Sequence, residues 1–185
     1  AVPVKVIKAL KELDLSMKPS LDFARDMFMF SFYTRGMSFV DMAYLKKTDL
    51  QNGILTYCRR KTGQQLTVKW EKCMEEIIKK YPSNNSAYLL PIIKEKRNER
   101  KQYDNALHLV NYRLKDLSEM LKLQRPLTMY VARHSWASAA KVRNVPLSVI
   151  SEGMGHDSEK TTQIYLASLE ASVVDKANKM ILESL

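Results

Sequence analysis

The chain has 185 residues and a formal net charge of +10, because 30 Lys and Arg residues outnumber 20 Asp and Glu residues. The length predicts one domain with a proper core, and no segment approaches the roughly 18 consecutive apolar residues of a membrane span or the apolar run of a signal peptide. The positive charge is not confined to a tail, so it favours a polyanion such as nucleic acid over an acidic membrane surface.

The first predicted elements are helical. Residues 19–36 begin with a proline and a serine suited to a helix start, carry Phe23, Met27 and Phe30 at helical spacing, and end at Gly36. Residues 38–50 predict a short second helix with its apolar side chains directed inward. We therefore expect two consecutive helices that pack on the core.

The pattern then changes from a helical to an alternating period. Residues 53–61 and 64–70 predict two strands joined by a turn at Thr62-Gly63, the only convincing hairpin in the sequence. The two cysteines, Cys58 and Cys73, are too few for a disulfide framework and too isolated for a zinc site. We expect both cysteines to be small core residues.

The remainder of the chain again has a helical pattern. The expected helices span residues 70–81, 98–123, 127–143, 146–155, 158–169 and 173–185. In the longest of them, the apolar stripe consists of Ala106, Leu109, Val110, Leu114, Leu117 and Leu121. No internal repeat or Gly/Ser linker divides the chain. We therefore expect a single domain over residues 1–185, of the α+β class and mainly α-helical, with one small antiparallel β-sheet.

Three residues of the second half are candidates for chemistry: Arg133, His156 and Tyr165. Separately they are explained as a surface charge, a helix-end residue and an aromatic at the core edge. Together they lie in the segment "ARHSWASAAKVRNVPLSVISEGMGHDSEKTTQIY". This segment resembles the second signature of the tyrosine recombinases, the phage integrase family. That signature has an Arg-His pair on one helix, a Gly-His at the end of another, and a nucleophilic tyrosine shortly after.

The resemblance extends over residues 20–175 and implies the family's catalytic domain, without its amino-terminal DNA-binding domains. It implies an enzyme that cleaves a DNA phosphodiester, leaving a 3′-phosphotyrosine and a free 5′-hydroxyl. Tyr165 is then the nucleophile and Arg133 the phosphate clamp, since a guanidinium offers a bidentate fork to the phosphate. His156 would donate to a non-bridging oxygen or help move the tyrosine's proton. No metal or other cofactor is expected, because the sequence offers no carboxylate cluster or His pair for one.

The hairpin carries a further expected site residue. The family has a general-acid lysine on its β-hairpin, and Lys61 stands just before the turn. Strand alternation directs Arg59 and Lys61 to one face and Arg60 to the other. The alternative is that these three residues form a solvated run of charges.

Two positions depart from the family pattern. Tyr130 stands where the second signature usually begins with histidine, and a phenol is a poor base near neutral pH. Ser38 stands where the first signature has its arginine, with Asp41 aligned as the following acidic residue. The variant "RGMS" resembles the integrases and invertases of bacterial conjugative and mobilisable elements.

We expect Arg35 to replace the missing arginine, with Arg59 as the alternative donor. A degenerate active site is the remaining alternative. Asp41 is expected to support this region through hydrogen bonds. His134 points about 100° away from Arg133 around the helix, so we expect it to be buried and structural, with an accessory role left open.

The expected partners are double-stranded DNA and other protomers in a DNA-bound tetramer, with no membrane. The tail over residues 171–185 has an apolar stripe that either folds onto its own domain or docks on the next protomer. Accessory DNA-bending proteins are left open, and the expected location is the bacterial cytoplasm, at the nucleoid. Two rival functions remain: a type IB topoisomerase-like relaxing enzyme, and a DNA-binding regulator with a degenerate site.

Overall fold

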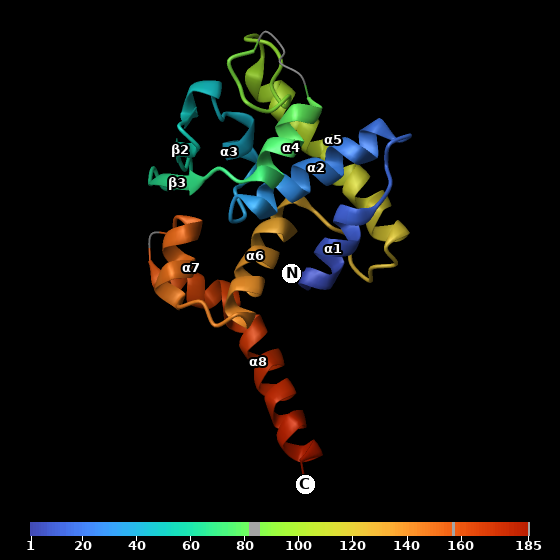
Figure 1. Cartoon of the computed structure of the whole chain (residues 1–185), viewed down its shortest axis with the longest axis vertical. Coiled ribbons are helices and arrows are strands. Elements are labelled where there is room, and N and C mark those ends of the chain that lie inside the picture. The colour runs from blue at the N-terminus through green and yellow to red at the C-terminus, as the bar shows by residue number, and fades with distance from the viewer. Residues whose placement is uncertain (82–85, 157, 185) are drawn as a thin grey trace.

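The computed structural model describes residues 1–81, 86–156 and 158–184, and Figure 1 shows how their elements are arranged. The α-helices are α1 (Val4–Glu12), α2 (Pro19–Tyr33), α3 (Phe39–Ala43), α4 (Lys72–Lys80), α5 (Glu99–Met120), α6 (Met129–Val142), α7 (Leu147–Met154) and α8 (Glu159–Glu183). The short 3₁₀ helix η1 (Lys47–Asp49) precedes the strands β1 (Leu50–Gln51), β2 (Ile54–Cys58) and β3 (Gln65–Lys69). The predicted α+β class, mainly helical with one small antiparallel sheet, is confirmed.

Helix α2 forms the centre of the main core. Its residues Met27, Phe28 and Phe30 are fully buried, because α2 packs against α1, α4, α5 and α6. A helix that is apolar around most of its surface is stable when its neighbours cover it in this way. The helix ends before Arg35 and Gly36, which adopt positive φ angles of 63° and 73°.

Helix α5 packs against α2 and buries one face in the same core. Val110, Leu114 and Leu117 are fully buried, as the predicted stripe requires. The prediction is wrong for Leu109, which is 49 % exposed. Neighbouring positions on a helix lie about 100° apart, so the face that buries Val110 leaves Leu109 at the solvent.

The sheet has the order β1-β2-β3, with antiparallel pairing throughout. Leu55 lies opposite Val68, and both are buried against the core. Cys58, at the end of β2, is exposed, so its predicted place in the core is wrong; strand alternation places it on the face opposite Leu55. Cys73 is half-buried.

Helices α6, α7 and the start of α8 enclose a second, smaller core. It consists of Ala137, Ala140, Ile150, Met154 and Leu166. Helix α6 joins the two cores, because its first residues, Met129 and Ala132, belong to the main one. No described helix is both long enough and apolar enough to cross a membrane.

Helix α8 runs without a break over the two segments predicted as separate helices, and it projects away from the rest of the molecule (Figure 1). Residues 170–172 continue the helix because they include no glycine or proline to end it. Among the described side chains of its outer half, Val174, Met180, Ile181 and Leu182 are all more than half exposed. These side chains are not packed on the chain's own core.

Candidate active site

Arg133 on α6 is held by two backbone carbonyl groups from different parts of the chain. Its Nη1 donates to the carbonyl oxygen of Gly36 at 2.9 Å, and its Nη2 donates to that of Met154 at 2.7 Å. The residue is only 4 % exposed. Burying a charged group is costly unless it is hydrogen-bonded, so these two bonds fix the guanidinium in one place.

Gly36 lies directly against the backbone of Arg133. A Cβ atom added to Gly36 would lie 2.6 Å from the Cα of Arg133, a distance that real Cβ atoms essentially never show. The positive φ angle of Gly36 adds a second reason for glycine at this position. The turn after α2 is therefore shaped to receive the arginine of α6.

We predict that Gly36→Ala destabilises the protein more than Gly53→Ala. Both glycines have a positive φ angle, which costs about 1–2 kcal/mol for alanine, but a Cβ at Gly53 would have no neighbour within 4 Å. Overpacking against Arg133 should add about 1–3 kcal/mol for Gly36→Ala. Urea unfolding of both variants measures the difference, and equal free energies of unfolding would contradict the close approach.

The loop between β2 and β3 packs on the glycine that ends α7. Arg59 is 7 % exposed, and its Nη1 donates to the carbonyl oxygen of Gly155 at 2.8 Å. Thr62 donates its hydroxyl to the same oxygen at 3.4 Å. Gly155 has a φ of 68°, and a Cβ there would lie 2.8 Å from Cδ1 of Leu66. Glycine thus allows the hairpin to approach α7 closely.

His156 directly follows this glycine and has a fixed orientation. It is buried, its backbone N–H donates to the carbonyl oxygen of Ser151, and its Nδ1 lies 2.6 Å from Oγ1 of the buried Thr162. Thr162 is on the first turns of α8 and was not singled out from the sequence. Tyr165 follows it by about one turn of the same helix. The side chain of Tyr165 lies outside the described part of the structure.

A cleft of ≈ 160 Å³ gathers most of the predicted site residues. It is lined by Arg59, Lys61, Thr62, Tyr130, Arg133, His156 and Thr161. Three of these residues are cationic and none is acidic, so the cleft suits an anion. Arg59 and Lys61 share the cleft, whereas the guanidinium of Arg60 lies 3.6 Å from the ring centre of Tyr44, outside it. The predicted division of the hairpin residues between two faces agrees with these contacts.

Arg35 and Ser38 do not line this cleft. The Nη2 of Arg35 donates to the carbonyl oxygen of Thr67 on β3 at 2.6 Å. Ser38 donates its hydroxyl to Asp41 at 2.7 Å, and the other oxygen of this buried carboxylate accepts the backbone N–H of Arg60 at 3.0 Å. Asp41 therefore ties the start of α3 to the hairpin loop.

Ser38 also lines a neighbouring cavity of ≈ 250 Å³ that shares Tyr130 and Arg133 with the cleft. Tyr130 is 60 % exposed, and its ring lies edge-on to that of His134, with 4.6 Å between the ring centres. His134 is half-buried, not fully buried as expected, because α6 turns it toward Tyr130 at the surface. Burial lowers the pKa of His134, so a neutral imidazole is favoured.

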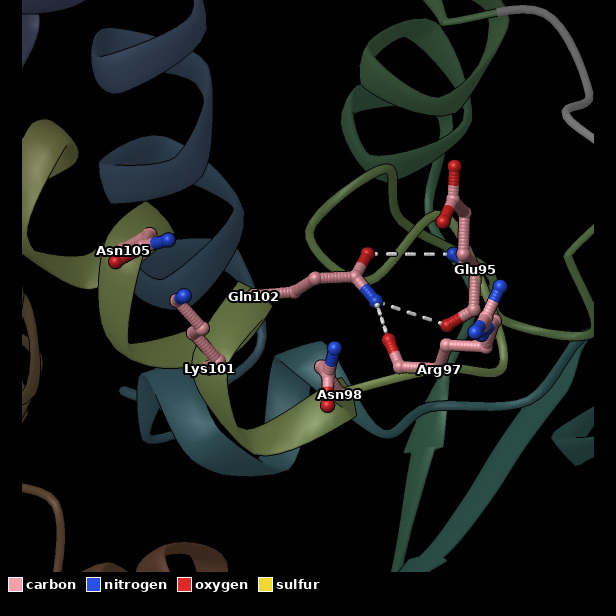
Figure 2. Close-up of a pocket in the computed structure, with 6 residues that line it drawn as sticks. All are labelled: Glu95, Arg97, Asn98, Lys101, Gln102 and Asn105. Carbon is pink, nitrogen blue, oxygen red and sulfur yellow. Dashed lines mark hydrogen bonds between the residues drawn. The ribbon is translucent and has the colours of Figure 1, made fainter.

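A larger hollow of ≈ 280 Å³ lies at the start of α5 (Figure 2). The side-chain amide of Gln102 accepts the backbone N–H groups of Lys94 and Glu95 and donates to the carbonyl oxygens of Glu95 and Arg97. These bonds hold the loop before α5 in place. The hollow shares no residue with the cleft and contains none of the predicted catalytic residues. In the part of the chain that the structure describes, no group of three or more His, Cys, Asp or Glu residues is suited to a metal ion.

The comparison with known families agrees with the geometry of the cleft. The family model described as the phage integrase family matches residues 6–172, which include every residue that lines the cleft. The chain belongs to the phage integrase family. No curated protein is similar enough in sequence to count as a match.

Solved structures of site-specific recombinases and of a transposon integrase have the same fold as this phage integrase family member. XerA recombinase is 17 % identical, with 84 % of this chain and 63 % of that chain covered and a TM-score of 0.56. XerH site-specific recombinase, bound to palindromic difH substrate, is 19 % identical, with 92 % of this chain and 49 % of that chain covered and a TM-score of 0.64. The Tn1549 transposon integrase, in complex with transposon right end DNA, is 11 % identical, with 96 % of this chain and 65 % of that chain covered and a TM-score of 0.61. The chain thus spans less than two thirds of each of these proteins.

Proposed function

We propose that this phage integrase family member is a site-specific DNA recombinase that cleaves and rejoins strands through a 3′-phosphotyrosyl intermediate on Tyr165. The observation that carries the proposal is the cleft, in which Arg59, Lys61, Arg133 and His156 meet beside the helix that carries Tyr165. The DNA complexes of XerH and of the Tn1549 integrase support double-stranded DNA as the partner.

In the proposed reaction, the phenolic oxygen of Tyr165 attacks the scissile phosphorus and the bond to the 5′-oxygen breaks. Arg133 stabilises the negative charge on the non-bridging oxygens of the pentavalent phosphate. The hydrogen bond between Nδ1 of His156 and Thr162 orients the ring, so we assign Nε2 to a non-bridging oxygen or to the tyrosine's proton. Lys61 donates a proton to the leaving 5′-oxygen. Attack by a 5′-hydroxyl of another strand on the phosphotyrosine reverses the step and rejoins the DNA.

The test is the capture of a covalent protein–DNA adduct. Duplexes are first selected from a randomised pool by binding to the Tyr165→Phe variant, then nicked near the scissile phosphate so that the short cleaved fragment diffuses away. An adduct that survives denaturing electrophoresis supports a recombinase or a type IB topoisomerase-like enzyme. The absence of an adduct would favour a DNA-binding regulator. Strand exchange between two duplexes then distinguishes a recombinase from a type IB topoisomerase-like enzyme. The regulator is kept as a candidate because Ser38 and Tyr130 depart from the family pattern.

Lys61→Ala is predicted to lower the cleavage rate by about 10² to 10⁴, the usual contribution of a general acid. Lys61 is exposed, so its truncation should leave the fold intact. A substrate with a 5′-bridging phosphorothiolate should restore cleavage, because a thiolate leaves without a proton. Lys69→Ala, an exposed lysine at the end of β3, is the matched control. If the sulfur substrate does not restore cleavage, Lys61 is not the general acid.

We also propose that α8 docks on a neighbouring protomer in a DNA-bound tetramer. The exposed side chains of Val174, Met180, Ile181 and Leu182 support this proposal, since they need an apolar partner surface. Docking of α8 from each protomer on the next would couple each active site to its neighbour, because α8 also carries Tyr165. Accessory DNA-bending proteins and location at the bacterial nucleoid are further parts of the proposal.

Deletion from residue 172 onward is predicted to impair recombination much more than binding to a single site. Each 1.4 kcal/mol of lost docking free energy changes an equilibrium about tenfold, so recombination should fall about tenfold or more. Ile181→Glu should reproduce the defect without removing the helix, with Lys179→Ala as its control on the same exposed turn. Gel-shift and strand-exchange assays measure the two activities, and full recombination by the truncated protein would exclude the docking role.

A further inference from the structure

The end of α7 holds two arginines with consecutive carbonyl groups. The carbonyl oxygen of Met154 accepts Nη2 of Arg133 at 2.7 Å, and that of Gly155 accepts Nη1 of Arg59 at 2.8 Å. Carbonyl groups at a helix C-terminus carry partial negative charge that is not used within the helix. Two guanidinium groups from distant segments are thereby fixed next to each other at one helix end.

The two guanidinium groups are suited to bind an anion. Arg133 and Arg59 are 4 % and 7 % exposed, and no acidic residue lines the cleft that they share. Two buried positive charges that share one cleft repel each other. A phosphate oxygen between them would supply the opposite charge and accept hydrogen bonds from both guanidinium groups.

We infer that Arg59 is the second guanidinium of the phosphate clamp, the role that Ser38 leaves unfilled in the first signature. The inference rests on the proposed function and assigns the alternative donor, Arg59, in preference to Arg35. Arg35 donates to Thr67 on β3 and does not line the cleft, whereas Arg59 lines it together with Arg133. No proton is transferred by Arg59: it donates hydrogen bonds to a non-bridging oxygen as Tyr165 attacks, and the proton for the leaving oxygen comes from Lys61.

The test compares cleavage of two substrates that differ at the scissile phosphorus. In the second substrate a methylphosphonate replaces the phosphate, so a neutral methyl group stands in place of one charged oxygen and the clamp has less charge to stabilise. Arg59→Ala should lower adduct formation on the phosphate about 10²- to 10³-fold, but on the methylphosphonate only about tenfold or less. The ratio of the two rates is measured within one protein preparation, so a reduced folded fraction cancels. Arg59→Gln gives the same ratio test if the alanine variant folds poorly, because its shorter amide keeps a donor near Gly155.

Arg60→Ala is the matched control, since it removes the same charge at the neighbouring residue, whose guanidinium stacks on Tyr44 outside the cleft. It should not change the ratio. A loss that is equal on both substrates for the Arg59 variants would make Arg59 a structural residue and overturn the inference. A charge-dependent ratio for Arg35→Ala instead of Arg59→Ala would also overturn it, in favour of Arg35. Failure of the unsubstituted protein to form any adduct would refute the proposed function itself, which is a separate outcome.

Discussion

A Tyr165→Phe variant is expected to form no covalent DNA adduct while it binds DNA almost as tightly as the unsubstituted protein. Only the attacking oxygen is removed, and affinity for DNA depends on many phosphate contacts elsewhere. The phenol at this position has no substitute in the proposed chemistry, so the loss of cleavage should be complete, not partial. Denaturing gels measure the adduct, and gel shifts at a stated salt concentration measure the affinity.

Tyr112→Phe is the matched control for this experiment, since it removes a phenolic hydroxyl from an exposed tyrosine on α5. It should cleave at the normal rate. An adduct formed by the Tyr165→Phe variant would show that the nucleophile is another residue. Loss of DNA affinity in the same variant would instead indicate that position 165 contributes to binding.

Arg133→Ala is expected to lower the rate of adduct formation by about 10² to 10³, far more than it lowers DNA affinity. The guanidinium is fixed by Gly36 and Met154, so it need not be reorganised as charge develops on the phosphate. Single-turnover cleavage with saturating protein measures this rate without the contribution of binding.

Two further measurements separate catalysis from folding in the Arg133→Ala variant. The truncation removes hydrogen bonds to two buried carbonyl groups, each worth about 1–3 kcal/mol when left without a partner, so some loss of stability is expected as well. Thermal unfolding reports that loss, and the assay is run well below the midpoint. Arg143→Ala, an exposed arginine at the end of the same helix, should change neither quantity. Near-normal cleavage by Arg133→Ala would mean that the active site lies elsewhere.

The helices of the core could be predicted from the sequence because their local pattern and their packing agree. Helix α2 is apolar on most sides and ends shortly before Gly36, and both properties are visible in the residue order. Where the sequence-based predictions failed, the segment either was too short to show a pattern or depends on contacts with another segment. Strand β1 has only two residues, too few for an alternating period, and it forms because β2 pairs with it. The first helix, α1, was not predicted either, and Arg25 on α2 holds its end by donating to the carbonyl oxygens of Leu10, Lys11 and Leu13.

Most of the residues that line the cleft were singled out from the sequence by their chemistry, but their arrangement was not predicted. By itself the sequence determined that the chain carries an arginine, a histidine, a hairpin lysine and a tyrosine in the order of a tyrosine recombinase, and that Ser38 leaves one position of that pattern without its arginine. Only the tertiary structure shows which other arginine lines the cleft together with Arg133. Arg35 is closer to Ser38 in the sequence, yet it donates to β3, whereas Arg59 reaches Gly155 at the end of α7. The physical reason is that a buried guanidinium must lie where backbone carbonyl groups can accept its hydrogen bonds, and those carbonyl groups belong to segments that only folding brings together.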